Sequence, residues 1–211
     1  MTPLFHEKPF SAINGSGKHI NWSLNYASGS SKITNLFSPE SSSENLFLLF
    51  TLIKLKAVLN NQKLYLSSVC VPGNELRLGG HEAPPRIISA FLGHHVTNMI
   101  EKLPQVIRLN LQEKIPNLVA NIPQEDTDRN RTSPYAYTSN RFEFRAVGST
   151  QNVLFPTTVI LTTIAKEISE AHKLLRDGMN VEDLISKLVE ETAEIRFEKD
   201  GYSKEWVEEA K

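Results

Sequence analysis

The sequence predicts an α+β fold, in which an antiparallel sheet is backed by helices and further helices follow toward the C-terminus. Two segments, residues 18–24 and 141–147, alternate polar and apolar side chains as half-buried strands do. Residues 44–60 are mostly apolar and predict a largely buried helix, and apolar residues from Ile160 to Leu175 recur at helical spacing. Strands with one apolar face and helices with an apolar stripe can bury those surfaces against each other.

Composition indicates a globular chain and excludes several classes of protein. Of the 211 residues, 40% are apolar and 22% charged, a length and balance that suit one domain, or one large domain with a helical appendage. The 23 basic and 24 acidic residues give a net charge of −1, which argues against nucleic-acid binding. No apolar run approaches the roughly 18 residues of a membrane span. The single cysteine, Cys70, favours a cytoplasmic location without disulfides, and we expect it in the core.

The first half of the chain is expected to contain a turn, a strand and two helices. Residues 14–17 predict a tight, glycine-rich turn that leads into the strand at 18–24. The serine-rich residues 28–43 predict a surface loop before the helix at 44–60. Residues 62–71 predict a short helix or strand. The strand has two faces: Ile20, Trp22 and Leu24 on one, and His19, Asn21 and Ser23 on the other.

The second half is expected to end in helices. Residues 86–92 are apolar and predict a buried strand, and residues 94–103 predict a helix that ends at Pro104. Residues 121–134 predict an ordered polar loop. Asn180 predicts the N-cap of a last helix, whose apolar residues are Val181, Leu184, Leu188 and Ile195.

Polar faces on the two strands are the first candidates for chemistry. Arg141, Glu143 and Arg145 share one face of their strand, which could be a surface ion-pair ladder or a site for a metal and anionic ligands. His19 could be a structural histidine or a divalent-metal ligand. The glycine turn before it favours the ligand interpretation, because glycine lets a ligand approach the backbone closely.

Two loops add further charged residues. Residues 128–131, Asp-Arg-Asn-Arg, could be solvated or could neutralise a phosphoryl group. Residues 77–84 hold an arginine and a glutamate on a loop shaped by glycine and proline, and they could equally form a surface turn. The chain shows no serine–histidine–aspartate or reactive-cysteine arrangement, so the pattern favours metal-assisted phosphoryl transfer.

These motifs together resemble the glutamine synthetases, and in detail their long class III members. They occur in the family's order over about residues 5–155, and the residues after 200 are similar to the family's helical extension. The motifs are His6–Phe10, Asn14–His19 with Asn21–Leu24, Arg77–Gly79 with Glu82–Pro85, Asp128–Pro134, Asn140–Arg145, and Asp200–Ser203 with Trp206.

The resemblance implies an ATP site with a divalent cation, Mg²⁺ or Mn²⁺. His19 and Glu143 would ligate the cation that holds the ATP phosphates, and Ser23 and Arg141 would contact the nucleotide. Arg131 would stabilise the phosphoryl group during its transfer.

It also implies sites for glutamate and ammonium. Arg77 and Arg145 would bind the substrate glutamate, with the backbone of Gly15 beside it. Glu82 would lie on a flap over the intermediate and help to receive ammonium. The family's reaction joins ammonia to the side-chain carboxylate of glutamate through an acyl phosphate, which a closed flap protects from water.

The resemblance divides the chain at about residue 155. Residues 1–155 would be a partial catalytic domain whose sheet forms part of a barrel, and residues 156–211 an incomplete C-terminal helical region. The family's N-terminal domain, and a segment with four further metal-binding glutamates, would precede this stretch. We therefore expect the chain alone to be inactive, and a full-length protein to form a homo-oligomer.

Two rival functions stay open. One is a related ligase that uses another amine or acid, although Arg77 and Arg145 together favour an amino-acid substrate. The other is a non-catalytic regulatory or interaction protein, which the missing metal ligands favour for this chain on its own.

Overall fold

The computed structural model describes residues 2–27, 29, 33–80, 83–109, 133–201 and 203–205 as an α+β fold. Its strands are β1 (Gly17–Trp22), β2 (Asn25–Ala27), β3 (Ile33–Asn35), β4 (Ala90–Phe91), β5 (Tyr135–Tyr137) and β6 (Phe142–Gly148). Its helices are α1 (Glu44–Asn60), α2 (Gln62–Ser68), α3 (Asn74–Arg77), α4 (His94–Leu109), α5 (Leu154–Arg176) and α6 (Val181–Glu191), followed by a 3₁₀ turn at Ala193–Ile195.

The main sheet has the order β1-β6-β5-β4 within the described residues. β6 pairs antiparallel with both β1 and β5, but β4 and β5 are parallel, so the expectation of an antiparallel sheet is wrong at this edge. A parallel pair needs a crossover connection, and α4 begins directly after β4 and supplies it. β2 and β3 form a separate antiparallel pair. The barrel stays a prediction.

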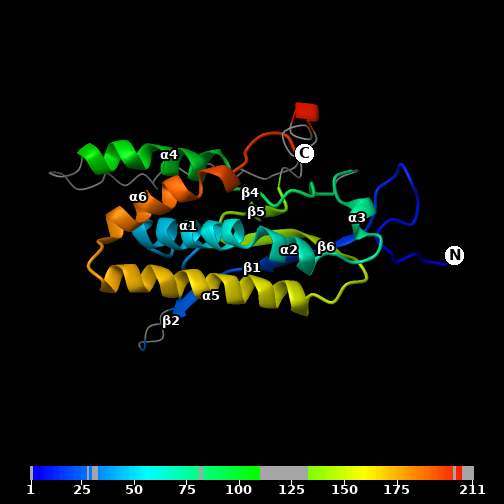
Figure 1. Cartoon of the computed structure of the whole chain (residues 1–211), viewed down its shortest axis with the longest axis horizontal. Coiled ribbons are helices and arrows are strands. Elements are labelled where there is room, and N and C mark those ends of the chain that lie inside the picture. The colour runs from blue at the N-terminus through cyan, green and yellow to red at the C-terminus, as the bar shows by residue number, and fades with distance from the viewer. Residues whose placement is uncertain are drawn as a thin grey trace.

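Helix α1 lies between α5 and α6 and contacts both (Figure 1). It can occupy this central position because its own apolar side chains lie on all of its sides. Phe47, Leu48, Leu52 and Leu55 of this helix are fully buried. The hydroxyl of Ser43 accepts a hydrogen bond from the Leu46 N–H at 3.4 Å and caps its first turn.

Aromatic side chains fill the contact between the sheet and the helices. Tyr135 on β5 stacks on Phe144 of β6 with 4.4 Å between ring centroids, and Tyr65 of α2 meets Tyr135 edge-on at 5.4 Å. Two residues before Phe144, Phe142 contacts Phe37 edge-on with 5.0 Å between centroids. The core therefore follows the apolar face that the alternating pattern of residues 141–147 predicts.

The C-terminal helices agree with their sequence signals. Helix α5 ends at Arg176, shortly before Gly178, which adopts a positive φ of 102°. The Oδ1 of Asn180 accepts a hydrogen bond from the Asp183 N–H at 2.7 Å, so Asn180 is the N-cap of α6 as predicted. None of the helices in the described ranges is long and apolar enough to cross a bilayer.

Several local expectations are wrong. Helix α4 continues past Pro104 to Leu109, because proline removes one backbone donor without necessarily ending a helix. In the segment 86–92 only two residues pair as a strand, since an apolar run signals burial and not pairing. The loop at 28–43 includes β3 and the fully buried Phe37, and Cys70 is exposed.

Candidate active site on strands β1 and β6

The pairing of β1 with β6 brings His19 and Glu143 together. Asn21 lies opposite Glu143 and Ile20 opposite Phe144, and the register shifts between Lys18 and Ile20, beside His19. The Nδ1 of His19 lies 2.7 Å from Oε1 of Glu143. The predicted proximity of these two side chains is confirmed, whereas their metal-binding role stays a prediction.

Glu143 is the centre of a short chain of charged groups. Its second oxygen, Oε2, accepts a hydrogen bond from the Arg145 Nε at 2.9 Å. The hydrogen bond from His19, the largest cause, and that from Arg145 together lower the pKa of Glu143 to about 2, against the opposing effect of burial. Glu143 is therefore a carboxylate at neutral pH and can only accept, so the proton of the 2.7 Å contact lies on Nδ1 of His19.

This protonation leaves Nε2 of a neutral His19 as the nitrogen with a free lone pair. An imidazole that donates to a carboxylate through one nitrogen and ligates through the other is a common metal-binding arrangement. The His19 side chain is 39% exposed, so an ion could reach it. His19 thus fits a divalent cation through Nε2, whereas Glu143, whose Oε1 is hydrogen-bonded to Nδ1, could ligate the same ion only once that hydrogen bond opens. In the described ranges no cluster of three or more histidine, cysteine, aspartate or glutamate side chains could complete the shell.

Arg77, predicted to bind the substrate, is buried beside β6. Its side chain is 5% exposed, its Nε donates to Asn74 Oδ1 at 2.9 Å, and its Nη2 donates to the carbonyls of Val147 at 3.1 Å and Arg145 at 3.4 Å. Burial lowers the pKa of Arg77, and the charge of Glu7 opposes that effect.

The glycine turn accommodates the Arg77 side chain. A Cβ at Gly17 would lie 2.5 Å from the guanidinium carbon of Arg77, and a Cβ at Gly15 would lie 2.3 Å from the carbonyl oxygen of Glu7. The sequence suggested that these glycines make room for a ligand. In the structure the groups that occupy the space are Arg77 and Glu7, which gives Gly15 and Gly17 a packing reason to be glycine.

The predicted nucleotide-binding residues lie at one end of the β1–β6 pair. Trp22 pairs with Phe142, so Ser23 follows β1 at the end where Arg141 precedes β6, and both residues are exposed. The predicted catalytic residues Arg131 and Glu82 lie outside the described residues.

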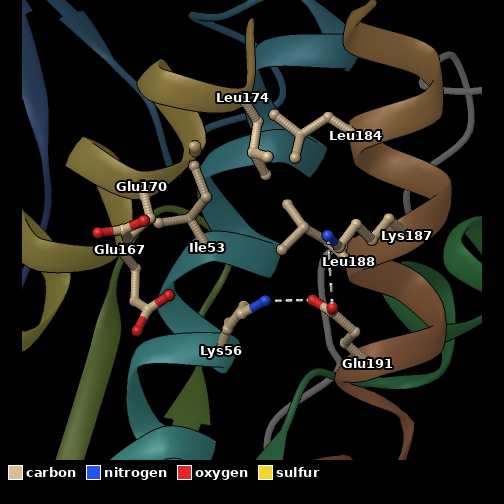
Figure 2. A pocket seen from close by; sticks show the side chains of 10 residues that line it. Ile53, Lys56, Glu167, Glu170, Leu174, Leu184, Lys187, Leu188 and Glu191 are labelled. Atoms are coloured by element: carbon tan, nitrogen blue, oxygen red, sulfur yellow. Dashed lines mark hydrogen bonds and ion pairs between the residues drawn. The ribbon is translucent and has the colours of Figure 1, made fainter. Parts of the chain in front are cut away.

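A pocket elsewhere in the fold holds none of these residues. It lies between α1, α5 and α6, with a volume of about 20 Å³, room for about one water molecule (Figure 2). Figure 2 shows Lys56 of α1 and Lys187 of α6 directed at Glu191, with which both form ion pairs. Glu167 and Glu170 of α5, together with leucine and isoleucine side chains, form the rest of its labelled lining. The pocket therefore belongs to the packing of the three helices.

Glu7 is the residue near this site that sequence reasoning gave no role. It is 1% exposed, and its Oε1 accepts hydrogen bonds from the Thr150 N–H at 3.0 Å and the Thr150 hydroxyl at 2.6 Å. Burial alone would raise the pKa of Glu7, but these bonds and the charge of Arg77 outweigh burial and lower it. A single carboxylate outside any periodic segment carries no signal of burial, although it belongs to the quoted motif His6–Phe10.

Comparison with known proteins gives matches along the chain. Residues 180–211 match the family model of the glutamine synthetase C-terminal domain. The chain is 40% identical over 225 residues to a glutamine synthetase of Bacteroides fragilis (strain YCH46), a match that covers 98% of this chain and 30% of that protein. It is 39% identical over 224 residues to the type-3 glutamine synthetase of Dictyostelium discoideum, covering 99% of this chain and 30% of that protein.

A third relative extends the same pattern. The chain is 34% identical over 220 residues to a glutamine synthetase of Butyrivibrio fibrisolvens, covering 98% of this chain and 31% of that protein. The chain thus spans about 30% of the length of the curated relatives that it matches.

Proposed function

The chain belongs to the glutamine synthetase family, and on that premise we propose that it carries part of the site for ATP-dependent ligation of ammonia to the side-chain carboxylate of glutamate. The observation that carries the proposal is the hydrogen-bonded series His19–Glu143–Arg145 on adjacent strands. It joins an imidazole that could ligate a metal, an ionised carboxylate and a guanidinium.

His19 and Glu143 are the residues that would hold a divalent cation, Mg²⁺ or Mn²⁺. When bound, the cation would neutralise charge on the ATP phosphates and hold them in place. The hydrogen bonds from His19 and Arg145 lower the pKa of Glu143 and so keep it ionised, and a protonated carboxyl group would be a poor ligand. Ser23 and Arg141, exposed at the end of the same strand pair, would contact the nucleotide.

Arg77 and Arg145 would bind the glutamate substrate, beside the backbone of Gly15. The position of Arg77 against β6 supports this assignment, because its Nη2 donates to the backbone carbonyl of Arg145 on the strand that carries the second arginine. Two guanidinium groups in a region of low exposure suit an anionic amino acid, since burial strengthens their attraction for a carboxylate. Arg131 would stabilise the phosphoryl group in transfer, and Glu82 would cover the intermediate and receive ammonium.

Further properties of a glutamine synthetase are part of the proposal. ATP, glutamate and ammonium would be the partners in the reaction, and the location would be cytoplasmic. A protein of the relatives' length would form homo-oligomers.

A non-catalytic role is the second candidate for this chain by itself. The observation that favours it is the absence, in the described ranges, of any group of three or more possible metal-ligating side chains. A regulatory or interaction protein would need only the fold and not a complete metal site.

A chimera tests the catalytic proposal directly. The region of the Dictyostelium type-3 enzyme that aligns with this chain is replaced by this chain, and glutamine formation from ATP, glutamate and ammonium is measured with Mg²⁺ or Mn²⁺. We expect an active chimera, and we expect the substitution Glu143→Gln in it to abolish most activity. A folded chimera without activity would favour the non-catalytic candidate. The matched control is Glu75→Gln, which changes an exposed carboxylate.

A further inference from the structure

Glu7 lies in a pocket of backbone that is shaped around its carboxylate. A Cβ at Gly148 would lie 2.6 Å from Oε1 of Glu7, and a Cβ at Gly73 would lie 3.6 Å from Oε2. The carbonyl oxygen of Glu7 accepts a hydrogen bond from the Ser16 N–H at 2.8 Å. Three separate segments, the glycine turn, the start of α3 and the end of β6, therefore meet at this one residue.

The same carboxylate supplies negative charge near Arg77. A buried guanidinium is costly unless an opposite charge lies near it. The other carboxylate of the site, Glu143, already accepts hydrogen bonds from His19 and Arg145. Glu7 is thus the carboxylate whose charge acts on Arg77, and Arg77 acts on Glu7 in return.

Two of the three nitrogen atoms of the Arg77 guanidinium donate hydrogen bonds to the protein. Its Nε and Nη2 donate to Asn74 and to backbone carbonyls of β6, whereas Nη1 has no hydrogen-bond partner in the described part of the chain. A Cβ at position 17 would lie 2.5 Å from Nη1. Gly17 therefore lets the buried guanidinium lie directly against the backbone of the turn, and Nη1 keeps donor capacity that an anion could use.

We propose that Glu7 is a positioning residue that, anchored by Thr150, fixes Arg77 and the glycine turn so that Nη1 of Arg77 meets a carboxylate of the substrate amino acid. This inference rests on the proposed function, because it takes Arg77 as the substrate-binding arginine. Glu7 itself touches neither substrate nor nucleotide in this scheme. Its effect should appear in amino-acid binding and not in nucleotide binding.

The experiment compares four variants of the whole chain with the unaltered chain. Glu7→Gln keeps the size of the side chain and removes its charge, Thr150→Val removes the hydroxyl donor, and Thr150→Ser restores it. Glu75→Gln is the matched control, since it removes an exposed carboxylate two residues from Arg77. Three quantities are measured: hydrogen exchange of the Arg77 Nε–H by ¹⁵N NMR, binding of L-glutamate by calorimetry, and binding of a non-hydrolysable ATP analogue with Mn²⁺.

We expect Glu7→Gln to speed exchange of the Arg77 Nε–H by about tenfold and to weaken L-glutamate binding by about tenfold, as loss of a buried charge partner does. Binding of the ATP analogue should stay within about twofold. Thr150→Val should change the first two quantities in the same direction, while Thr150→Ser and Glu75→Gln should match the unaltered chain.

Three results would overturn the positioning role. One is a folded Glu7→Gln protein with unchanged Arg77 exchange and unchanged L-glutamate binding. The second is an equal loss of L-glutamate and ATP-analogue binding, which would mean a general structural role. The third applies if Glu7→Gln does not fold: it is unchanged hydrogen exchange of Arg77 in Thr150→Val.

Failure of the proposed function would look different. If the unaltered chain binds no L-glutamate, the assignment of Arg77 to the substrate fails for this chain. Arg77 exchange in Glu7→Gln and Thr150→Val then decides by itself whether Glu7 positions Arg77.

Discussion

Glu143 determines the charge balance of the candidate site at the scale of single residues. It accepts from His19 with one oxygen and from Arg145 with the other, and the His19 bond is the larger reason why its pKa falls to about 2. A carboxylate held in this way contributes stability above its unfolded pKa of 4.5 and loses it as the pH falls toward 2.

Replacing Glu143 should therefore destabilise the fold in a pH-dependent way. The difference between 4.5 and about 2 corresponds to at most about 3 kcal/mol, and partial solvent exposure reduces it, so we expect Glu143→Gln to cost about 1–2 kcal/mol at pH 7. Urea unfolding at pH 7 and pH 3 measures the effect, which should shrink at the lower pH. An equal cost at both pH values would show that the ionised form contributes nothing.

Lys54 is a second residue with an unusual environment. It is fully buried, its Nζ has no hydrogen-bond partner in the described residues, and it lies 3.8 Å from the ring centroid of Tyr135 and 4.1 Å from that of Phe142. Burial lowers its pKa well below the usual 10.5. Between the lowered pKa of the folded state and 10.5, the unfolded chain binds more protons than the folded chain. The protein therefore loses stability as the pH falls through that range.

Lys54→Met should stabilise the protein, and more so at low pH. Methionine has a similar length and pays no cost for a buried amine, so we expect a gain of about 1–3 kcal/mol at pH 6 and a smaller gain at pH 9. Chemical unfolding at pH 6 and pH 9 tests this prediction. Both pH values lie below the pKa of Tyr65, which is about 12, so ionisation of Tyr65 does not affect the comparison. Lys56→Met, which removes a half-buried lysine paired with Glu191, is the control and should not stabilise. A gain that does not change with pH would contradict the argument.

The sequence could predict the contact between His19 and Glu143 but not the burial of Arg77 or Glu7. Each of the two residues lies on the polar face of an alternating strand, and the resemblance to glutamine synthetases implies that both ligate one cation, so their contact could be predicted. Arg77 donates to backbone carbonyls of β6, about 70 residues further along the chain. The local sequence around an arginine does not predict which distant backbone carbonyls its guanidinium will donate to.

At the scale of elements, Asn180 begins α6 and fixes how that helix leaves the end of α5. Its Oδ1 accepts from the Asp183 N–H at 2.7 Å, and Leu184 and Leu188 then pack into the core. The acidic residues Glu182 and Asp183 lie in the first turn, where the helix dipole favours negative charge.

Asn180→Ala should lower the free energy of unfolding by about 1 kcal/mol, since alanine offers no acceptor to the first turn. Asn180→Ser keeps an acceptor and should cost much less. Thermal unfolding followed by circular dichroism gives the order of the three proteins. Equal values for the alanine and serine variants would mean that this cap contributes little to the fold.

Elements whose residues repeat with a period were predictable, and elements set by tertiary pairing were not. Helices α5 and α6 follow apolar spacing, and α1 follows from its long apolar run. α1 and α6 lie where the sequence predicts them, and α5 begins earlier, at Leu154. Strand β4 has two residues and pairs parallel with β5, which is far from it in the sequence. Such pairing depends on contacts between distant parts of the chain, so the local alternation of side chains does not indicate it.

At the scale of the whole molecule, the described residues bring few possible metal ligands together. The described residues bring one imidazole and one carboxylate together, and no larger group of possible ligands occurs among them. A hard cation such as Mg²⁺ takes six ligands, so most of its shell would be water and its position loosely defined.

We therefore expect the chain alone to bind Mn²⁺ weakly and to form glutamine far more slowly than a full-length type-3 relative. Two ligands orient the ion poorly, so little would offset the charge where ATP phosphates and the substrate carboxylate approach each other. Electron paramagnetic resonance titration with Mn²⁺ measures affinity and stoichiometry, and an assay with ATP, glutamate and ammonium measures turnover. His19→Ala should remove the weak binding, while His172→Ala, on the exposed side of α5, should not. Tight binding of two ions with turnover near that of the relative would contradict this argument, and it would mean that carboxylates beyond the described residues, or from a second copy of the chain, complete the site.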